Sequence, residues 1–144
     1  MTRCLSTLAL VTLWCTSALA QDRVVLVASA ASPIDAISSF ETRKIYLGIG
    51  VFKDGRLIVG LRNQADRMLT EVFLQSVVGL SEERYERRLL SNVFKYGTLR
   101  PEEFSDVESL TAALAGNPYA VSYLWVTDGV PPGLRVLRVL WQGL

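Results

Sequence analysis

Short apolar runs alternate with helix-period segments along most of the chain. Residues 23–28 are continuous and β-branched, which is typical of a strand buried on both faces. Similar runs predict three further strands, at residues 57–61, 119–126 and 134–140. Apolar positions recurring every three or four residues predict helices, which with their caps and terminal glycines span residues 39–48, 67–79, 81–97 and 105–116. The alternation favours one α/β domain of about four strands flanked by about four helices.

A polar loop at residues 62–66 separates the second predicted strand from the helix that follows it. An α/β fold usually binds its ligand at such a loop, because free backbone N–H groups and the positive helix end point there. Two arginines, Arg62 and Arg67, flank the loop, and Asp66 is placed to cap the helix. The pattern therefore predicts the position of a binding site without identifying its ligand.

Residues 1–20 have the order of a secretory signal peptide. Arg3 gives a positive start, residues 5–13 are mostly apolar, and Ala18-Leu19-Ala20 is a small-x-small cleavage site. We expect cleavage after Ala20, which leaves one domain of residues 21–144. This domain is expected to be periplasmic or secreted, with no stable membrane insertion. An uncleaved anchor is the alternative, and a lipoprotein at Cys15 ranks below it because Trp14 precedes that cysteine.

Removing residues 1–20 changes the chemistry that the chain can carry. Both cysteines lie in that segment and the chain has no histidine. We therefore expect no zinc or copper site, and Ser-His-Asp or Cys-His catalysis is excluded from this chain by itself. The formal net charge falls from +1 to about zero, which does not favour a nucleic-acid partner. Paired glutamates at 82–83 and 102–103 are adjacent and do not face each other. We therefore expect no metal, no cofactor and no enzyme activity.

The segment from about Val25 to Val139 resembles the phosphate-type substrate-binding proteins of bacterial ABC transporters, which have the type 2 periplasmic binding fold. The resemblance lies in the order and spacing of several motifs, which are Lys44-Ile45-Tyr46-Leu47-Gly48, the Asp54-Gly55 turn, the strand 57–62, the loop 63–67, Phe73 in the next helix, and Asn117-Pro118-Tyr119-Ala120-Val121-Ser122-Tyr123. It implies a single three-layer α/β lobe, since the length suffices for one lobe only. It also implies a small oxyanion such as phosphate as ligand.

The oxyanion contacts that the resemblance implies are Ser29, Ser32, Arg62 and Arg67. The loop Gln64-Ala65-Asp66-Arg67 departs from the Gly/Ser/Thr-rich loop of the family, and Asp66 puts a negative charge near the oxyanion position. We therefore expect any binding by this chain alone to be weak.

Each of these residues also has a structural interpretation. Arg62 can pair with Asp66 or Glu71 on the surface, and Ser29 and Ser32 can be turn or cap residues. Arg84, Arg87 and Arg88 can form a solvated helix face or contact a partner, and the aromatic side chains of strand 119–126 can pack in the core.

Two functions remain open from the sequence. The first is an exported periplasmic solute-binding-like protein that binds a small oxyanion weakly or acts beside a transport or signalling complex. The second is an interaction or assembly subunit of the cell envelope, with a protein partner or a homodimer, that keeps the lobe but has lost the ligand.

Overall fold

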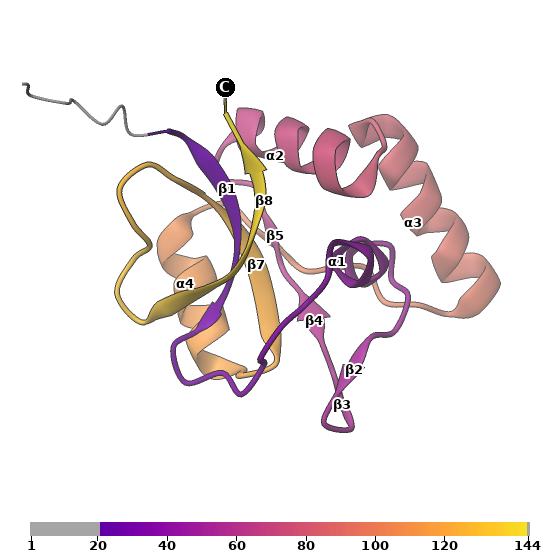
Figure 1. Cartoon of the computed structure of the whole chain (residues 1–144). Coiled ribbons are helices and arrows are strands. Elements are labelled where there is room, and N and C mark those ends of the chain that lie inside the picture. The colour runs from indigo at the N-terminus through magenta and orange to yellow at the C-terminus, as the bar shows by residue number, and fades with distance from the viewer. Residues whose placement is uncertain (1–20, 144) are drawn as a thin grey trace, which may run out of the picture.

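The computed structural model describes residues 21–143, whose strands and helices follow the predicted order (Figure 1). In chain order the elements are β1 (Arg23–Ser29), α1 (Ser39–Tyr46), β2 (Phe52–Lys53), β3 (Arg56–Leu57), β4 (Val59–Gly60), β5 (Arg62–Asn63), α2 (Arg67–Phe73), the π-helical turn η1 (Leu74–Val78), α3 (Glu82–Tyr96), β6 (Glu103–Phe104), α4 (Val107–Gly116), β7 (Ala120–Val126) and β8 (Leu134–Gln142). The predicted signal peptide, residues 1–20, lies outside the described residues, so its cleavage stays a prediction. No described helix is long and apolar enough to cross a membrane.

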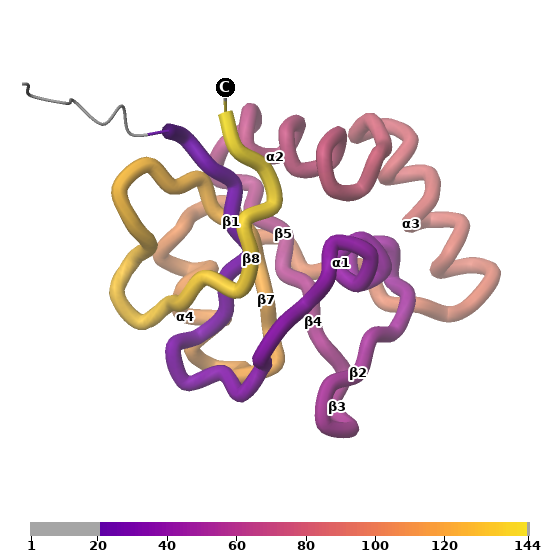
Figure 2. Tube along the Cα trace, viewed as in Figure 1, coloured from indigo at the N-terminus to yellow at the C-terminus, as the bar shows by residue number. Residues whose placement is uncertain are grey.

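A four-stranded mixed sheet forms the centre of the molecule, in the order β4-β7-β1-β8. β1 runs antiparallel to both of its neighbours, and β4 runs parallel to β7. Two small ribbons complete the strands: β2 pairs with β3 around the Asp54-Gly55 turn, and β5 pairs in parallel with β6. The first residues of β1 and the last residues of β8 lie next to each other at one edge of the molecule (Figure 2).

Helices cover both faces of the sheet, which makes the three layers that the sequence predicted. The alternation in β1 sends Val24 and Leu26 to one face and Val25 and Val27 to the other. On the first face they join side chains from α1, α2, η1 and α3, and on the second face they join Leu110 of α4. The sheet of four strands and the four α-helices confirm the predicted fold class.

Local capping signals set the helix starts where the sequence placed them. Ser38 forms a capping box with Glu41 at α1, Ser81 caps α3, and Asp106 caps α4. α3 ends at Gly97, whose positive φ of 63° is easily adopted only without a Cβ. These ends depend on neighbouring residues alone, which is why a single sequence predicts them.

The segment predicted as one strand followed by a polar loop is different in the structure. Residues 56–63 form three short strands instead of one, and Arg62 and Asn63 are strand residues buried to 1% exposure rather than loop residues. The cause is a change of partner: the N–H of Leu61 donates to Val121 of β7, whereas the N–H of Arg62 donates to Glu102 beside β6. The segment between α3 and α4, for which the sequence predicted neither helix nor strand, therefore contains a short strand, β6.

Candidate functional site

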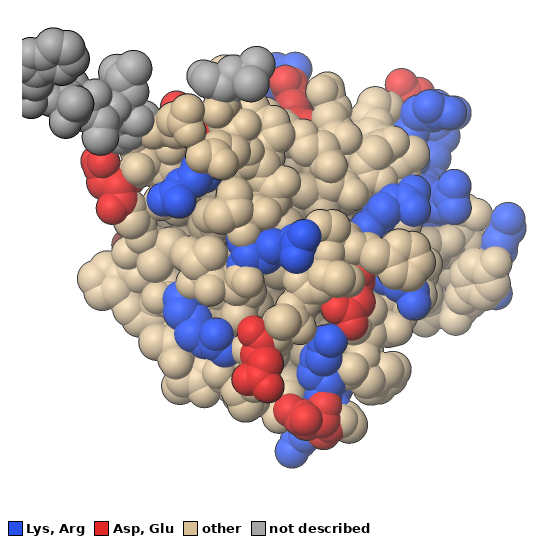
Figure 3. Space-filling view, viewed as in Figure 1, with Lys and Arg blue, Asp and Glu red and all other residues tan. Residues whose placement is uncertain are grey.

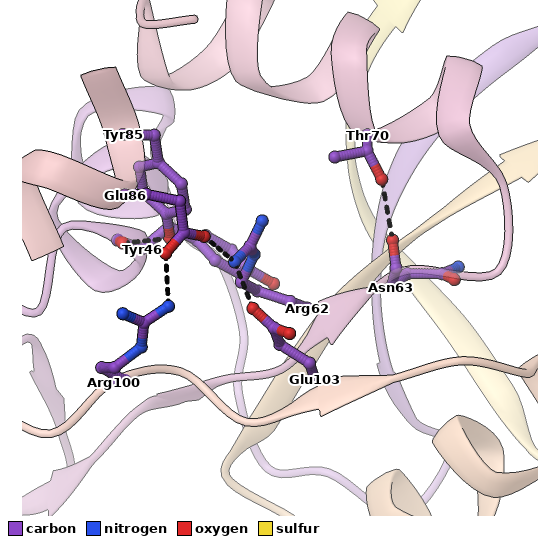
Figure 4. A network of polar contacts seen from close by, with 8 residues as sticks. All are labelled: Tyr46, Arg62, Asn63, Thr70, Tyr85, Glu86, Arg100 and Glu103. Atoms are coloured by element: carbon purple, nitrogen blue, oxygen red, sulfur yellow. Dashed lines mark hydrogen bonds and ion pairs between the residues drawn. The ribbon is translucent and has the colours of Figure 1, made fainter. Parts of the chain in front are cut away.

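The candidate site begins at Asn63, which fixes the loop between β5 and α2. Its side-chain Nδ2 donates to the Tyr123 carbonyl at 3.1 Å, and its Oδ1 accepts from the Ala65 N–H at 3.0 Å. The Thr70 hydroxyl donates back to the Asn63 carbonyl at 3.3 Å, a contact that Figure 4 shows. Hydrogen bonds to β7 and from α2 thus hold Asn63 at the start of this loop.

Asp66 caps α2 as the sequence predicted. Its Oδ1 accepts hydrogen bonds from the N–H groups of Met68 at 2.8 Å and Leu69 at 3.2 Å. Both N–H groups belong to the first turn of α2 and have no partner within the helix, so an oxyanion at this position would need them. The Asp66 carboxylate therefore takes the N–H groups that the resemblance to phosphate-binding proteins assigns to a bound anion.

Arg62 is the largest fully buried side chain among the described residues, with 1% of it exposed. Its Nη1 donates to Glu86 of α3 at 2.8 Å and also to Glu103 of β6. Glu86 accepts a second ion pair from Arg100, and the guanidinium lies 4.9 Å from the centre of the Tyr85 ring. Figure 4 shows this network joining β5, α3 and the segment that leads to β6. The positive charge of Arg62 is thus balanced inside the protein.

Three buried polar atoms of this region have no hydrogen-bond partner among the described residues. They are Nε and Nη2 of Arg62 and the hydroxyl oxygen of Tyr123. Buried donors without partners are rare in folded proteins, because each costs about 1–3 kcal/mol. The Arg62 guanidinium therefore retains donor capacity that its two carboxylate partners do not use.

The environment fixes the charge state of the network near neutral pH. Burial raises the pKa of Tyr123 to about 12, and burial also raises the pKa of Tyr85, so both phenols stay neutral. Burial opposes the charge on Arg62, but the hydrogen bond to Glu86 and the electrostatic interactions with Tyr85, Tyr123 and Glu103 together outweigh it and raise the pKa of Arg62. Burial likewise opposes ionisation of Glu86, yet the hydrogen bonds from Arg100 and Arg62 lower its pKa below 4.5. Arg62 therefore stays charged inside the network, and Glu86 is ionised beside it.

The lowered pKa of Glu86 predicts an acid dependence of stability. A carboxyl whose folded pKa is depressed stabilises the protein above its unfolded pKa and loses that contribution as the pH falls through the folded pKa. We therefore expect Glu86→Gln to lower the free energy of unfolding at pH 7, with the difference from the native chain shrinking below pH 4.5. Urea unfolding at several pH values measures this difference.

The matched control is Glu83→Gln, because Glu83 lies one turn away with 81% of its side chain exposed and pairs with Arg87 on the surface. That exposed pair should change stability by less than about 0.5 kcal/mol. A Glu86→Gln difference that stayed constant from pH 7 to pH 3 would mean that the ionised carboxylate is not what stabilises the network.

The four predicted anion contacts do not form one cluster. Ala28 of β1 and Gly60 of β4 lie on either side of Val121 of β7. Because β1 and β4 run in opposite directions, Ser29 lies toward one end of the sheet and Arg62 toward the other. The Ser32 hydroxyl donates to the Pro118 carbonyl at 2.5 Å. The two serines share one turn, in which the Ser32 N–H donates to the Ser29 carbonyl at 2.9 Å. Among the described residues, no hydrogen bond or ion pair joins either serine to Arg62 or Arg67.

The two arginines also lie in different environments. Arg67 has 90% of its side chain exposed and pairs with Glu71 at 3.2 Å, while Arg62 points into the core. The sequence alternative that paired Arg62 with Asp66 or Glu71 is wrong, because its partners are Glu86 and Glu103. Whether any of the four predicted contacts binds an oxyanion stays a prediction.

Sequence reasoning missed Glu86, Arg100 and Glu103. Glu86 had one local signal, since it follows buried Tyr85 and precedes buried Leu89 by three residues on α3. Glu103 had none, because its contact with Arg62 spans 41 residues of sequence. Among the described residues no group of three or more His, Cys, Asp or Glu side chains could hold a metal ion.

Comparisons with known proteins place this fold. No family model matches the chain, and no curated protein matches it by sequence. Solved structures do: an ABC-type phosphate transport receptor from Vibrio cholerae matches with a TM-score of 0.58 and 16% identity over 83% of this chain and 47% of the other. A putative phosphate ABC transporter substrate-binding protein with bound phosphate, from Clostridium perfringens, matches with a TM-score of 0.60 and 19% identity over 83% and 46%.

PstS from Borrelia burgdorferi matches with a TM-score of 0.54 and 14% identity over 82% of this chain and 47% of the other. The chain thus spans about half the length of these structures. Identities this low show the fold alone, and the named neighbours are transport proteins rather than enzymes. The described chain has the fold of a single lobe of the substrate-binding proteins of phosphate ABC transporters, as the resemblance in its sequence implied.

Proposed function

We propose that this chain is an exported interaction module of the cell envelope, built on a substrate-binding lobe, that does not enclose an oxyanion by itself. It acts beside a transport or signalling complex through contacts with a protein partner. Its role is binding rather than catalysis. Export with cleavage after Ala20 is part of the proposal.

The observation that carries the proposal is that carboxylates of the chain occupy the groups that an oxyanion would use. Asp66 accepts from the first N–H groups of α2, and Glu86 and Glu103 balance the charge of Arg62. A phosphate at the start of α2 would have to displace the Asp66 carboxylate, and a phosphate at Arg62 would have to displace Glu86 or Glu103. This arrangement supports a lobe that keeps its fold without binding the implied ligand.

An apolar groove of about 410 Å³ supports a role in contacts with other molecules. It lies between the β2–β3 ribbon, β4 and residues 98–102, and Ile49, Leu57 and Leu99 line it. These three side chains are 46%, 49% and 89% exposed. Apolar side chains gathered at an open groove are typical of surfaces that a partner covers.

Thermal unfolding in phosphate tests the proposal. We expect the melting temperature of the native chain to be the same in sodium phosphate as in sodium chloride of equal ionic strength. Asp66→Ser keeps a capping oxygen but removes the charge, so we expect this variant to gain about 3–5 °C once phosphate exceeds its Kd tenfold. Sulfate in place of phosphate shows whether the response extends to other oxyanions.

A second candidate is weak oxyanion binding at Arg62. The unpaired Nε and Nη2 of Arg62, together with the unpaired Tyr123 hydroxyl, favour it. In that case phosphate would raise the melting temperature of the native chain, and Arg62→Met would remove the rise while Arg67→Met, with its exposed side chain, would not. That result would overturn the first proposal.

A further inference from the structure

The outer face of α3 carries a row of basic side chains that the candidate site does not use. Arg84, Arg87, Arg88 and Lys95 are exposed and recur at helical spacing, opposite the buried side chains of the same helix. Arg87 pairs with Glu83 at 3.0 Å, while Arg84, Arg88 and Lys95 form no ion pair with any described residue. We define these four residues as the basic face of α3.

The three arginines of this basic face surround a hollow in the protein surface. It has a volume of about 280 Å³ and is lined by Arg84, Arg87, Arg88 and Ser91. The guanidinium groups present a fork of donors that matches phosphate oxygens, and the serine adds a hydroxyl. The hollow is shallow and open, so it suits a phosphate group presented on a surface rather than an enclosed solute.

Exposed apolar side chains lie along the same helix. Leu90 and Phe94 are one turn apart and are 50% and 80% exposed. The C-terminal end of α1 contacts α3 through Tyr85 and Asn92. On α1, Phe40 is 67% exposed, with the Lys44 ammonium 5.4 Å from the centre of its ring. Figure 3 shows Lys and Arg gathered over the side of the molecule where Figure 1 places α1 and α3. Basic and aromatic side chains on one face are the combination that binds a lipid interface.

We propose that the basic face of α3 docks on an anionic phospholipid bilayer. A bilayer fits better than an acidic peptide, because the face is the outside of a projecting helix with a shallow hollow and not a groove that could align an extended chain. The guanidinium groups contact headgroup phosphates, and Phe94 enters the headgroup layer. This inference goes beyond the proposed function, since docking requires neither an oxyanion site nor a protein partner.

Vesicle binding tests the inference with the chain from Gln21, which contains every described residue. We use vesicles of phosphatidylcholine with about 30% phosphatidylglycerol, and vesicles of phosphatidylcholine alone. One basic residue near an anionic surface strengthens binding by about fivefold. We therefore expect the protein to sediment only with the anionic vesicles, and the bound fraction to fall as the salt concentration rises. Equal binding to both vesicles, or none to either at low salt, overturns the proposal.

Charge reversal locates the surface. Arg84→Glu with Arg88→Glu should weaken binding to the anionic vesicles by more than tenfold. The matched control is Arg56→Glu with Arg138→Glu, which changes the net charge equally at two exposed positions outside α3 and should retain most of the binding. Equal losses in both double variants would assign the binding to net charge and contradict the proposal.

Phe94→Ser separates insertion from charge. It should weaken binding severalfold at every salt concentration, because the apolar contact is not screened. Unchanged melting temperatures show that the variants remain folded.

A polyglutamate peptide tests an acidic protein partner in place of a bilayer. If this peptide binds the native chain while the anionic vesicles do not, the basic face of α3 binds an acidic protein and the lipid proposal is wrong.

Discussion

Replacing Arg62 with alanine is expected to lower the free energy of unfolding by about 3 kcal/mol. The side chain is 1% exposed, so its removal leaves a space in the core as well as two broken ion pairs. Glu86 and Glu103 are 37% and 45% exposed, so water can hydrate them, and the lost packing therefore contributes most of the effect. Urea unfolding followed by circular dichroism measures the change.

Two variants separate the causes of that loss. Arg62→Met fills most of the space without the charge, and we expect it to recover more than half of the lost stability. Arg87→Ala removes an exposed ion pair of the same residue types and should cost less than about 0.5 kcal/mol. A loss below 1 kcal/mol for Arg62→Ala would show that the core closes around the missing side chain.

Phe73→Ala is expected to lower the free energy of unfolding by about 4 kcal/mol. Phe73 ends α2 and is 1% exposed. Its ring stacks on Tyr123 of β7 with centroids 3.6 Å apart, and it meets the Tyr46 ring edge-on at 4.8 Å. Truncation therefore leaves a cavity where α1, α2 and the sheet meet, and chemical denaturation measures the cost.

Phe94→Ala provides the matched control, because the same residue type on α3 is 80% exposed. We expect it to change the free energy of unfolding by no more than about 0.5 kcal/mol. Equal losses of stability in the two variants would mean that burial and the ring contacts of Phe73 do not contribute to the free energy of unfolding.

The sequence predicted the features that depend on short stretches of chain. Apolar periodicity located the helices, the residue types Ser and Asp located their caps, and glycine located their ends. The predicted aromatic core face of strand 119–126 is also confirmed, with Tyr123 fully buried between Tyr46 and Phe73. All of these follow from side-chain chemistry read over fewer than about twenty residues.

The candidate site depended on contacts that a single sequence does not contain. Arg62 follows an apolar strand, so the sequence alone offered two interpretations, an anion ligand or a surface partner of Asp66 or Glu71. Its actual partners, Glu86 and Glu103, are 24 and 41 residues away. The antiparallel direction of β1, which sends Ser29 away from Arg62, is likewise a property of strand pairing rather than of either segment.

The pairing of β1 with β8 has a mechanical consequence. Arg23 lies opposite Gln142, and the Gly143 N–H donates to the Asp22 carbonyl at 2.9 Å, so the two ends of the described chain meet at one point of the surface. A linker of a few residues could close them into a ring or a circular permutant without disturbing the fold. Joined instead to a second body, the same two strands would act as a double tether, which allows bending about one axis while resisting twist.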